Sequence, residues 1–299
     1  MRILFFFLPT ILPILTIAQI DSAFANADSL NVWSPKGVLH FNFSNVGLSN
    51  WAGGGQDALS LTSDLEYSLD YSDPRMIWDN DISIVYGVTR TGDIKEFRKT
   101  DDQLNFTSIY GRKLGQHSYL SSSLEFWTQL TNGYEYTDTT DTPTKRLVSR
   151  FLAPGYLSSS TGFTAKKKDK YTLTIAPFTG KLTIVRDDSL SNAGAFGVGV
   201  GEHFRFEGGA SINGNFEQQL MENTRFRISA DFFSGYQNFG TIDVNIRSSI
   251  KMKVNELISS SFSVTLIYDE DVDIQRDDGT VGPALQFRNT INVGFYLNL

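Results

Sequence analysis

The chain has 299 residues, no cysteine and a formal net charge of -7 at pH 7. Without cysteine it can form no disulfide scaffold, thiolate metal site, cysteine nucleophile or lipoprotein-type lipid anchor. The acidic balance disfavours nucleic acid as a partner, because nucleic-acid-binding domains carry clustered basic residues. Phenylalanine occurs 23 times, which is more than a water-soluble domain of this length needs.

The N-terminal segment has the pattern of a secretory signal peptide. A short positive start precedes a nearly unbroken apolar stretch from Ile3 to Ala18, and small residues around positions 18 and 27 suit cleavage. A membrane anchor helix is the alternative, but two prolines and the short apolar length disfavour it. We predict that residues 1–27 are a signal peptide and a short N-terminal segment, with cleavage near 18 or 27. Residues 28–299 would then form a single domain.

Apolar and polar residues alternate with a period of two through the rest of the chain. Such alternation predicts strands with one apolar and one polar face. In the run 58–71, leucines and tyrosines at odd positions alternate with serine, threonine, aspartate and glutamate at even positions. About twelve such runs occur, at 37–45, 58–71, 77–89, 103–112, 118–130, 150–165, 170–178, 202–217, 224–235, 241–254, 257–269 and 284–299.

The connections between these runs alternate in length. Short turns are predicted at 72–75, 113–117, 166–169, 218–223 and 255–256. Mostly longer connections are predicted at 46–57, 90–102, 131–149, 179–201, 236–240 and 270–283. Short turns on one rim and long loops on the other are typical of outer-membrane barrels.

A secreted β-sandwich or jelly roll is the soluble alternative, since its strands also alternate. Several of the runs are longer than about ten residues, the length that crosses a bilayer when tilted. The apolar faces of the clearest runs also carry no charged residue, as lipid contact requires. We therefore predict an all-β, antiparallel, up-and-down transmembrane β-barrel of about twelve strands in a Gram-negative outer membrane.

Four stretches resemble an uncharacterised family of bacterial outer-membrane β-barrel proteins, known only as a domain of unknown function. The resemblance implies a barrel and assigns no activity. Glycine, tryptophan and proline in these stretches either shape long loops or form a shared surface for a ligand or partner. The candidate loop motif comprises Asn50, Trp51, Gly53, Gly54 and Gly55. The stretches are 48–55, 97–102, 151–156 and 176–185, the last continuing into 193–197.

Few residues suit catalysis. By strand phase, His40 and His203 face the interior, and His117 lies in a predicted turn. A barrel lipase would need a lipid-facing histidine, and a barrel protease of the Asp/His type would need one near the outer loops. No pair of carboxylates stands out for glycoside hydrolysis. We expect no enzymatic activity, and a lipid hydrolase is the disfavoured alternative.

The acidic segment 269–279 begins with an Asp-x-Asp-x-Asp pattern. It lacks the glycine and the final glutamate of an EF-hand, because Ile274 and Thr280 occupy those positions. A solvated, turn-forming loop is the preferred interpretation, and a loose divalent-cation site is the alternative. No catalytic residue, cofactor site or metal site is assigned.

The charges predicted to face the interior are segregated along the chain. Early strands supply mainly acids and later strands mainly bases, so the two groups would face each other across a ring. The candidate lumen residues are Asp64, Glu66, Asp70, Asp81, Glu125, Arg205, Arg225, Arg227, Arg247, Lys251, Lys253 and Arg288. An open lumen with such walls would select polar or charged solutes, whereas in a narrow lumen the same charges would meet as ion pairs.

Two functions follow from these alternatives. The first is a passive, porin-like channel for small polar or charged solutes. The second is a structural or binding barrel with a closed polar lumen, whose long loops contact a partner or glycan. The expected partners are outer-membrane lipid, a small solute and, through the alternating C-terminal run 295–299, the barrel-insertion machinery.

Overall fold

The computed structural model describes residues 32–48, 56–92, 94, 96–137, 144–167, 170–276 and 280–299. The predicted signal peptide at 1–27 lies outside the described residues. So does the candidate loop motif of Asn50, Trp51, Gly53, Gly54 and Gly55. Among the described residues, no helix has the length and apolar character needed to cross a membrane.

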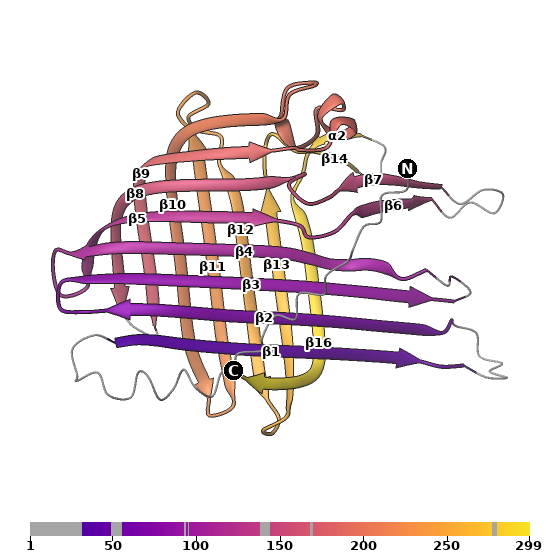
Figure 1. Ribbon diagram of the computed structural model, residues 1–299, viewed down its shortest axis with the longest axis horizontal. Helices are drawn as coiled ribbons and strands as arrows, with labels where there is room; N and C mark the ends of the chain where they lie inside the picture. The colour runs from indigo at the N-terminus through magenta and orange to yellow at the C-terminus, as the bar shows by residue number, and fades with distance from the viewer. Residues whose placement is uncertain are drawn as a thin grey trace, which may run out of the picture.

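Antiparallel strands form a closed barrel (Figure 1). Consecutive barrel strands pair along the chain, and the last strand closes on the first. The barrel strands are β1 (Val32–Val46), β2 (Ala58–Ser72), β3 (Met76–Thr91), β4 (Arg98–Lys113), β5 (Ser118–Thr128), β8 (Gly155–Lys167), β9 (Tyr171–Ile184), β10 (Phe204–Met221), β11 (Thr224–Gly235), β12 (Asp243–Lys253), β13 (Ile258–Tyr268) and β16 (Gln286–Asn298). The predicted twelve-stranded, up-and-down barrel is therefore confirmed.

The remaining elements belong to the longer connections between barrel strands. They are β6 (Gly133–Thr137), β7 (Thr144–Ser149), α2 (Asp188–Asn192), the 3-10 turn η2 (Ala195–Gly197), β14 (Asp273–Gln275) and β15 (Val281–Pro283). In Figure 1 the β6–β7 hairpin and α2 lie at the end of the barrel opposite the turn between β2 and β3. One end thus carries tight turns and the other carries structured loops.

β9 is longer than the sequence pattern predicts. A bulge at Pro177 and Phe178 shifts its register against both neighbours, so two consecutive residues oppose one. Phe178 is 72% exposed, whereas Ala176 and Thr179 on either side of the bulge are buried. Alternation resumes beyond the bulge to Ile184, so the predicted loop 179–201 is shortened to 185–203.

β4 also begins earlier than predicted. A register shift opposite Gly87 and Val88 inserts one extra residue near Thr100, which breaks the period of two. The strand therefore starts at Arg98 rather than at residue 103, and Asp101 becomes part of the barrel wall.

The two faces of the barrel differ in polarity. Large apolar side chains point outward, with Phe206 70% and Ile291 75% exposed, whereas small polar side chains such as Ser123 and Thr174 are buried on the inner face. This arrangement is the reverse of that in a water-soluble protein, in which apolar side chains are buried and polar ones are exposed. It suits a lipid exterior, where an apolar surface meets hydrocarbon and every strand edge is paired.

The long loops form a compact layer of their own. Ala153, Val185, Leu190 and Val198 make a small buried apolar cluster, with Ala195 and Phe196 packed against it. These residues come from the β5–β8 and β9–β10 connections, so the two loops are packed together and not splayed.

Candidate functional site

Glu66 joins opposite parts of the barrel wall. The Nζ of Lys251 donates to Oε1 of Glu66 at 2.6 Å, and Nη1 of Arg227 lies 3.7 Å from its Oε2. Glu66 is on β2, Lys251 on β12 and Arg227 on β11, and β2 is a neighbour of neither strand. Arg227 also forms an ion pair with Glu217 of β10, with Nη2 2.7 Å from Oε2. These charges therefore meet as ion pairs across the lumen.

Two further ion pairs cross between strands that are not adjacent. Lys166 of β8 pairs with Asp79 of β3, and Arg288 of β16 pairs with Asp101 of β4. Sequence reasoning assigned Arg288 to the lumen but missed its partner, because the bulge in β4 hid the strand around Asp101. It missed Lys166 because that residue was placed in a turn. Asp79 lies two residues before Asp81 on the same strand and therefore faces the same side, which could have identified it as a lumen residue.

A third group of charges lies toward the structured loops. Lys181 donates to Asp243 at 2.7 Å and lies 3.8 Å from Asp269. Its ammonium also lies 5.3 Å from the ring centroid of Phe233. Lys181 was predicted to be in a loop, and only the bulge in β9 explains why it faces inward.

Arg205 connects this group to two loops. It donates to Glu207 at 2.6 Å and to the carbonyl of Gly197 at 3.1 Å, and it pairs with Asp271 in the β13–β16 connection. The β9–β10 and β13–β16 connections are therefore both tied to one guanidinium at the mouth of the barrel.

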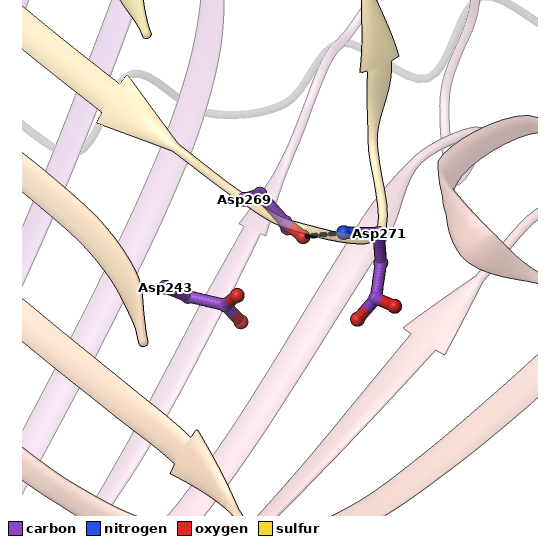
Figure 2. Close-up of side chains that lie close together, drawn as sticks. All are labelled: Asp243, Asp269 and Asp271. Carbon is purple, nitrogen blue, oxygen red and sulfur yellow. Dashed lines mark hydrogen bonds between the residues drawn. The ribbon is translucent and has the colours of Figure 1, made fainter. Parts of the chain in front are cut away.

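Three carboxylates converge at this mouth (Figure 2). One oxygen from each of Asp243, Asp269 and Asp271 lies within 4.8 Å of the others, so the group could hold a metal ion. Two protein cations already neutralise it, since Lys181 binds Asp243 and Arg205 binds Asp271. The arrangement therefore acts as an ion-pair network between barrel and loop.

A polar cavity of about 110 Å³ lies within the lumen. Asp231 accepts from Asn213 at 3.1 Å and from Arg247 at 3.1 Å. Glu125 also lines the cavity, and no hydrogen bond or ion pair from another described residue reaches its carboxylate. The lining comprises Thr107, Ile109, Ser123, Glu125, Thr172, Thr174, Asn213, Asn215, Ser229, Asp231 and Arg247.

The other predicted lumen charges lie on the inward phase of their strands. Arg225 lies 3.2 Å from Glu217. Asp64 is paired in register with His40 of β1, and Asp70 with Asp79 of β3. Asp81 of β3 and Lys253 of β12 occupy the same phase as the paired residues of those strands, Asp79 and Lys251.

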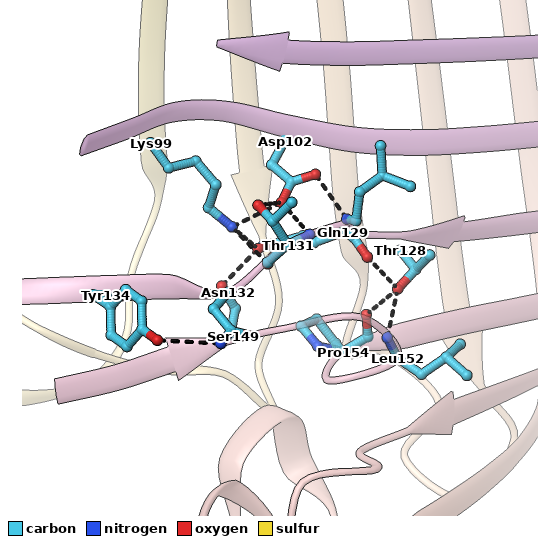
Figure 3. Close-up of polar contacts among 11 residues, drawn as sticks. Lys99, Asp102, Thr128, Gln129, Thr131, Asn132, Tyr134, Ser149, Leu152 and Pro154 are labelled. Carbon is cyan, nitrogen blue, oxygen red and sulfur yellow. Dashed lines mark hydrogen bonds and ion pairs between the residues drawn. The ribbon is translucent and has the colours of Figure 1, made fainter. Parts of the chain in front are cut away.

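The stretch 97–102 anchors a loop (Figure 3). The Asp102 carboxylate, whose side chain is 1% exposed, accepts from the backbone N–H groups of Leu130 and Thr131 at 2.7 and 2.8 Å. Lys99 donates to Asp102 at 2.9 Å and to Gln129 at 2.8 Å. This stretch therefore holds the start of the β5–β8 connection.

The stretch 151–156 anchors the other end of the same connection. Thr128 donates to the carbonyl of Pro154 at 2.9 Å and accepts from the N–H of Leu152 at 2.9 Å (Figure 3). The stretches 97–102 and 151–156 therefore both shape a loop, which favours the architectural interpretation of these two motifs.

Asp187 caps the short helix α2. Its carboxylate accepts from the Ser189 hydroxyl and, at 2.9 Å, from the Arg150 guanidinium. It also accepts from the N–H groups of Ser189 and Leu190 at 3.0 and 3.2 Å. The hydrogen bonds from Ser189 and Arg150 lower the pKa of Asp187 to about 2. The loop layer is thus stabilised by a carboxylate that stays ionised.

The histidines occupy different settings. His203 lies just before β10 and not within the strand as predicted. Its Nδ1 is 2.8 Å from the carbonyl oxygen of Val185, and its Nε2 is 3.5 Å from Asp188. His40 faces the lumen, with Nδ1 3.4 Å from the Ser259 hydroxyl.

Comparison with known proteins assigns no activity to this chain. No curated protein shows a significant match to the sequence. An outer membrane channel from Pseudomonas putida F1 is similar in structure, with 12% identity, 92% of this chain and 98% of that chain covered and a TM-score of 0.40. The translocator domain of the autotransporter NalP from Neisseria meningitidis is also similar, with 9% identity, 94% and 93% covered and a TM-score of 0.38.

One family matches part of the sequence. Residues 43–134, from the end of β1 into β6, match a family described as "Protein of unknown function (DUF3078)". Two of the four quoted stretches, 48–55 and 97–102, lie within this match, and the other two lie beyond it. The expected resemblance to a domain of unknown function is thereby confirmed for residues 43–134, which form part of a closed, twelve-stranded barrel.

Proposed function

We propose that the chain is an outer-membrane barrel that passes small polar or charged solutes through a narrow, ion-paired lumen. The outward apolar face and the paired strand edges support a location in lipid. The observation that carries the transport proposal is the polar cavity of about 110 Å³ in the lumen. Short serine, threonine and asparagine side chains line it, so the lumen is not packed as an apolar core.

The ion pairs would set the resistance of this passage. The ion pairs across the lumen are made by the long side chains of Lys251, Arg227 and Glu66. Long side chains can exchange partners with a passing ion, whereas a backbone plug could not. We therefore expect a low single-channel conductance that depends on these charges.

Planar-bilayer recording of the purified, folded full chain tests the proposal. The chain should give small stepwise currents, and the double variant Glu66→Gln/Lys251→Met should give larger ones because it removes a crossing pair without leaving a lone charge. If neither protein conducts although both are folded, the transport proposal is wrong.

A closed barrel with a functional loop surface is the second candidate. The apolar cluster around Val185 and Leu190 supports it, because the loops form an ordered surface at the mouth. Its expected ligand is a partner protein or envelope glycan. Shortening the segment 188–201 should then abolish ligand capture while leaving the barrel folded, and capture that persists in the shortened chain would contradict it.

We propose no enzymatic role. A lipid hydrolase of this architecture requires a histidine on the lipid-facing surface of the strands, whereas His40 lies on the inner face and His203 lies just before β10, with Nδ1 at a backbone carbonyl and Nε2 3.5 Å from Asp188. Lipid hydrolysis by the purified protein that is lost on replacing either histidine would overturn this view. The other proposed partners are outer-membrane lipid and the barrel-insertion machinery, with no role for nucleic acid.

A further inference from the structure

We infer that the central cavity of the lumen is a binding site for one small monovalent cation, held chiefly by Glu125 and Asp231. The inference deepens the proposed function and rests on it for one point, namely that solutes reach the lumen. The cavity is about 110 Å³ in volume and is lined by residues of β4, β5, β9, β10, β11 and β12.

The charges around the cavity do not balance. Two carboxylates, Glu125 and Asp231, face one guanidinium, Arg247, which lies 3.1 Å from Asp231. Among the described residues no hydrogen bond or ion pair reaches the Glu125 carboxylate, and the attraction that Arg247 exerts on it is shared with Asp231. An ionised carboxylate is costly to bury unless a positive charge compensates it. A single uncompensated charge calls for a monovalent ion.

The size of the cavity limits the ligand. At about 30 Å³ for each liquid water, it holds about three or four waters. That space suits an alkali-metal or ammonium ion with a few waters.

The lining supplies the right donor atoms. Thr107, Ser123, Thr172 and Asn215 line the space, and their side chains carry hydroxyl or amide oxygens. Hard oxygen ligands of this kind suit alkali-metal cations, and oxygen acceptors equally suit the N–H groups of ammonium.

The acidic cluster at the mouth is a weaker site for a cation. Lys181 and Arg205 already bind Asp243 and Asp271 there, so a cation would have to displace protein ammonium or guanidinium groups. No protein cation binds Glu125 among the described residues, and a solute ion therefore meets less competition in the central cavity.

Equilibrium dialysis of thallium(I), a mimic of potassium, against the folded full chain in detergent tests the inference. The chain should bind one ion, and Glu125→Gln should weaken binding by about tenfold or more. This variant removes an unpartnered buried charge and should therefore fold at least as well. Glu217→Gln is the matched control, because it makes the same charge change at a lumen carboxylate that pairs with Arg225 and Arg227. It should bind within about twofold of the unchanged chain.

The outcomes separate this inference from the proposed function. Absence of thallium(I) binding, or equal binding by Glu125→Gln, would overturn the cation site even if the barrel conducts. Binding of iodide that depends on Arg247 would overturn it as well, because the cavity would then select anions. Binding that depends on Glu125 in a barrel without conductance would support the site and contradict only the transport proposal.

Discussion

The ammonium nitrogen of Lys251 lies 2.6 Å from Oε1 of Glu66, although their strands are not neighbours in the barrel. The pair thus joins two parts of the wall that backbone hydrogen bonds do not connect. The side chains are 31% and 33% exposed, so solvent weakens their attraction only in part. We expect Lys251→Met to lower the free energy of unfolding by about 1–2 kcal/mol, because Glu66 then loses its shorter contact. Urea unfolding in lipid vesicles measures the change.

The double variant Glu66→Gln/Lys251→Met serves as the control for this pair. Because it leaves no lone carboxylate, it should recover part of the lost stability. A double variant that is as unstable as the sum of the two single variants would show that the pair contributes nothing.

Asp102 is expected to be the most sensitive position of the loop anchor. It accepts two backbone N–H groups and the Thr131 hydroxyl, and it pairs with Lys99. Asp102→Ala should lower the unfolding free energy by about 2–4 kcal/mol, because it leaves buried donors unpaired. Asp188→Ala, at a carboxylate that is 90% exposed, is the control and should change stability by less than about 0.5 kcal/mol. Equal losses in both variants would refute the anchoring role.

The loop layer should loosen in acid. The pKa of Asp187 is lowered to about 2 from the ordinary value of 3.8. A lowered pKa means that ionised Asp187 stabilises the folded loop fully above the ordinary value, and that this contribution is lost as pH falls through the folded pKa. Hydrogen exchange of the 188–192 amides should therefore accelerate between about pH 4 and pH 2. Asp187→Asn should exchange faster at neutral pH and lack this step, and an unchanged pH profile in the variant would contradict the prediction.

A charged residue introduced on the outward face should destabilise the barrel in a bilayer. Ile291 lies in the middle of β16 and is 75% exposed. In a bilayer Ile291→Arg should cost about 2–4 kcal/mol, the usual penalty for arginine near the midplane. Folding yields in lipid vesicles measure this cost. Asn292→Arg places the same side chain on the inner face one residue away, and it should fold better than Ile291→Arg. The reverse order would mean that the assigned faces are exchanged.

Much of this architecture could be predicted from the order of the residues. Alternation in 58–71 and in the other runs, together with the alternating loop lengths, predicts the barrel because side chains of a strand point to opposite faces in turn. The prediction was wrong at the ends of β4 and β9, where bulges reverse the phase. Lys181 and Asp101 were missed for that reason, since a period of two cannot be followed across an inserted residue.

The sequence by itself determined which side chains could face inward, because strand phase is a local property. Only the tertiary structure decided which of these charges meet. Closure of the ring brings Glu66 beside Lys251, 185 residues later in the chain, and leaves the Glu125 carboxylate without a hydrogen bond or contact ion pair among the described residues. Such contacts depend on strand tilt and register around the whole barrel, which no local pattern encodes. The sequence therefore determines which charged residues can face the lumen. The fold determines which of these charges form ion pairs and which carboxylate is left without one.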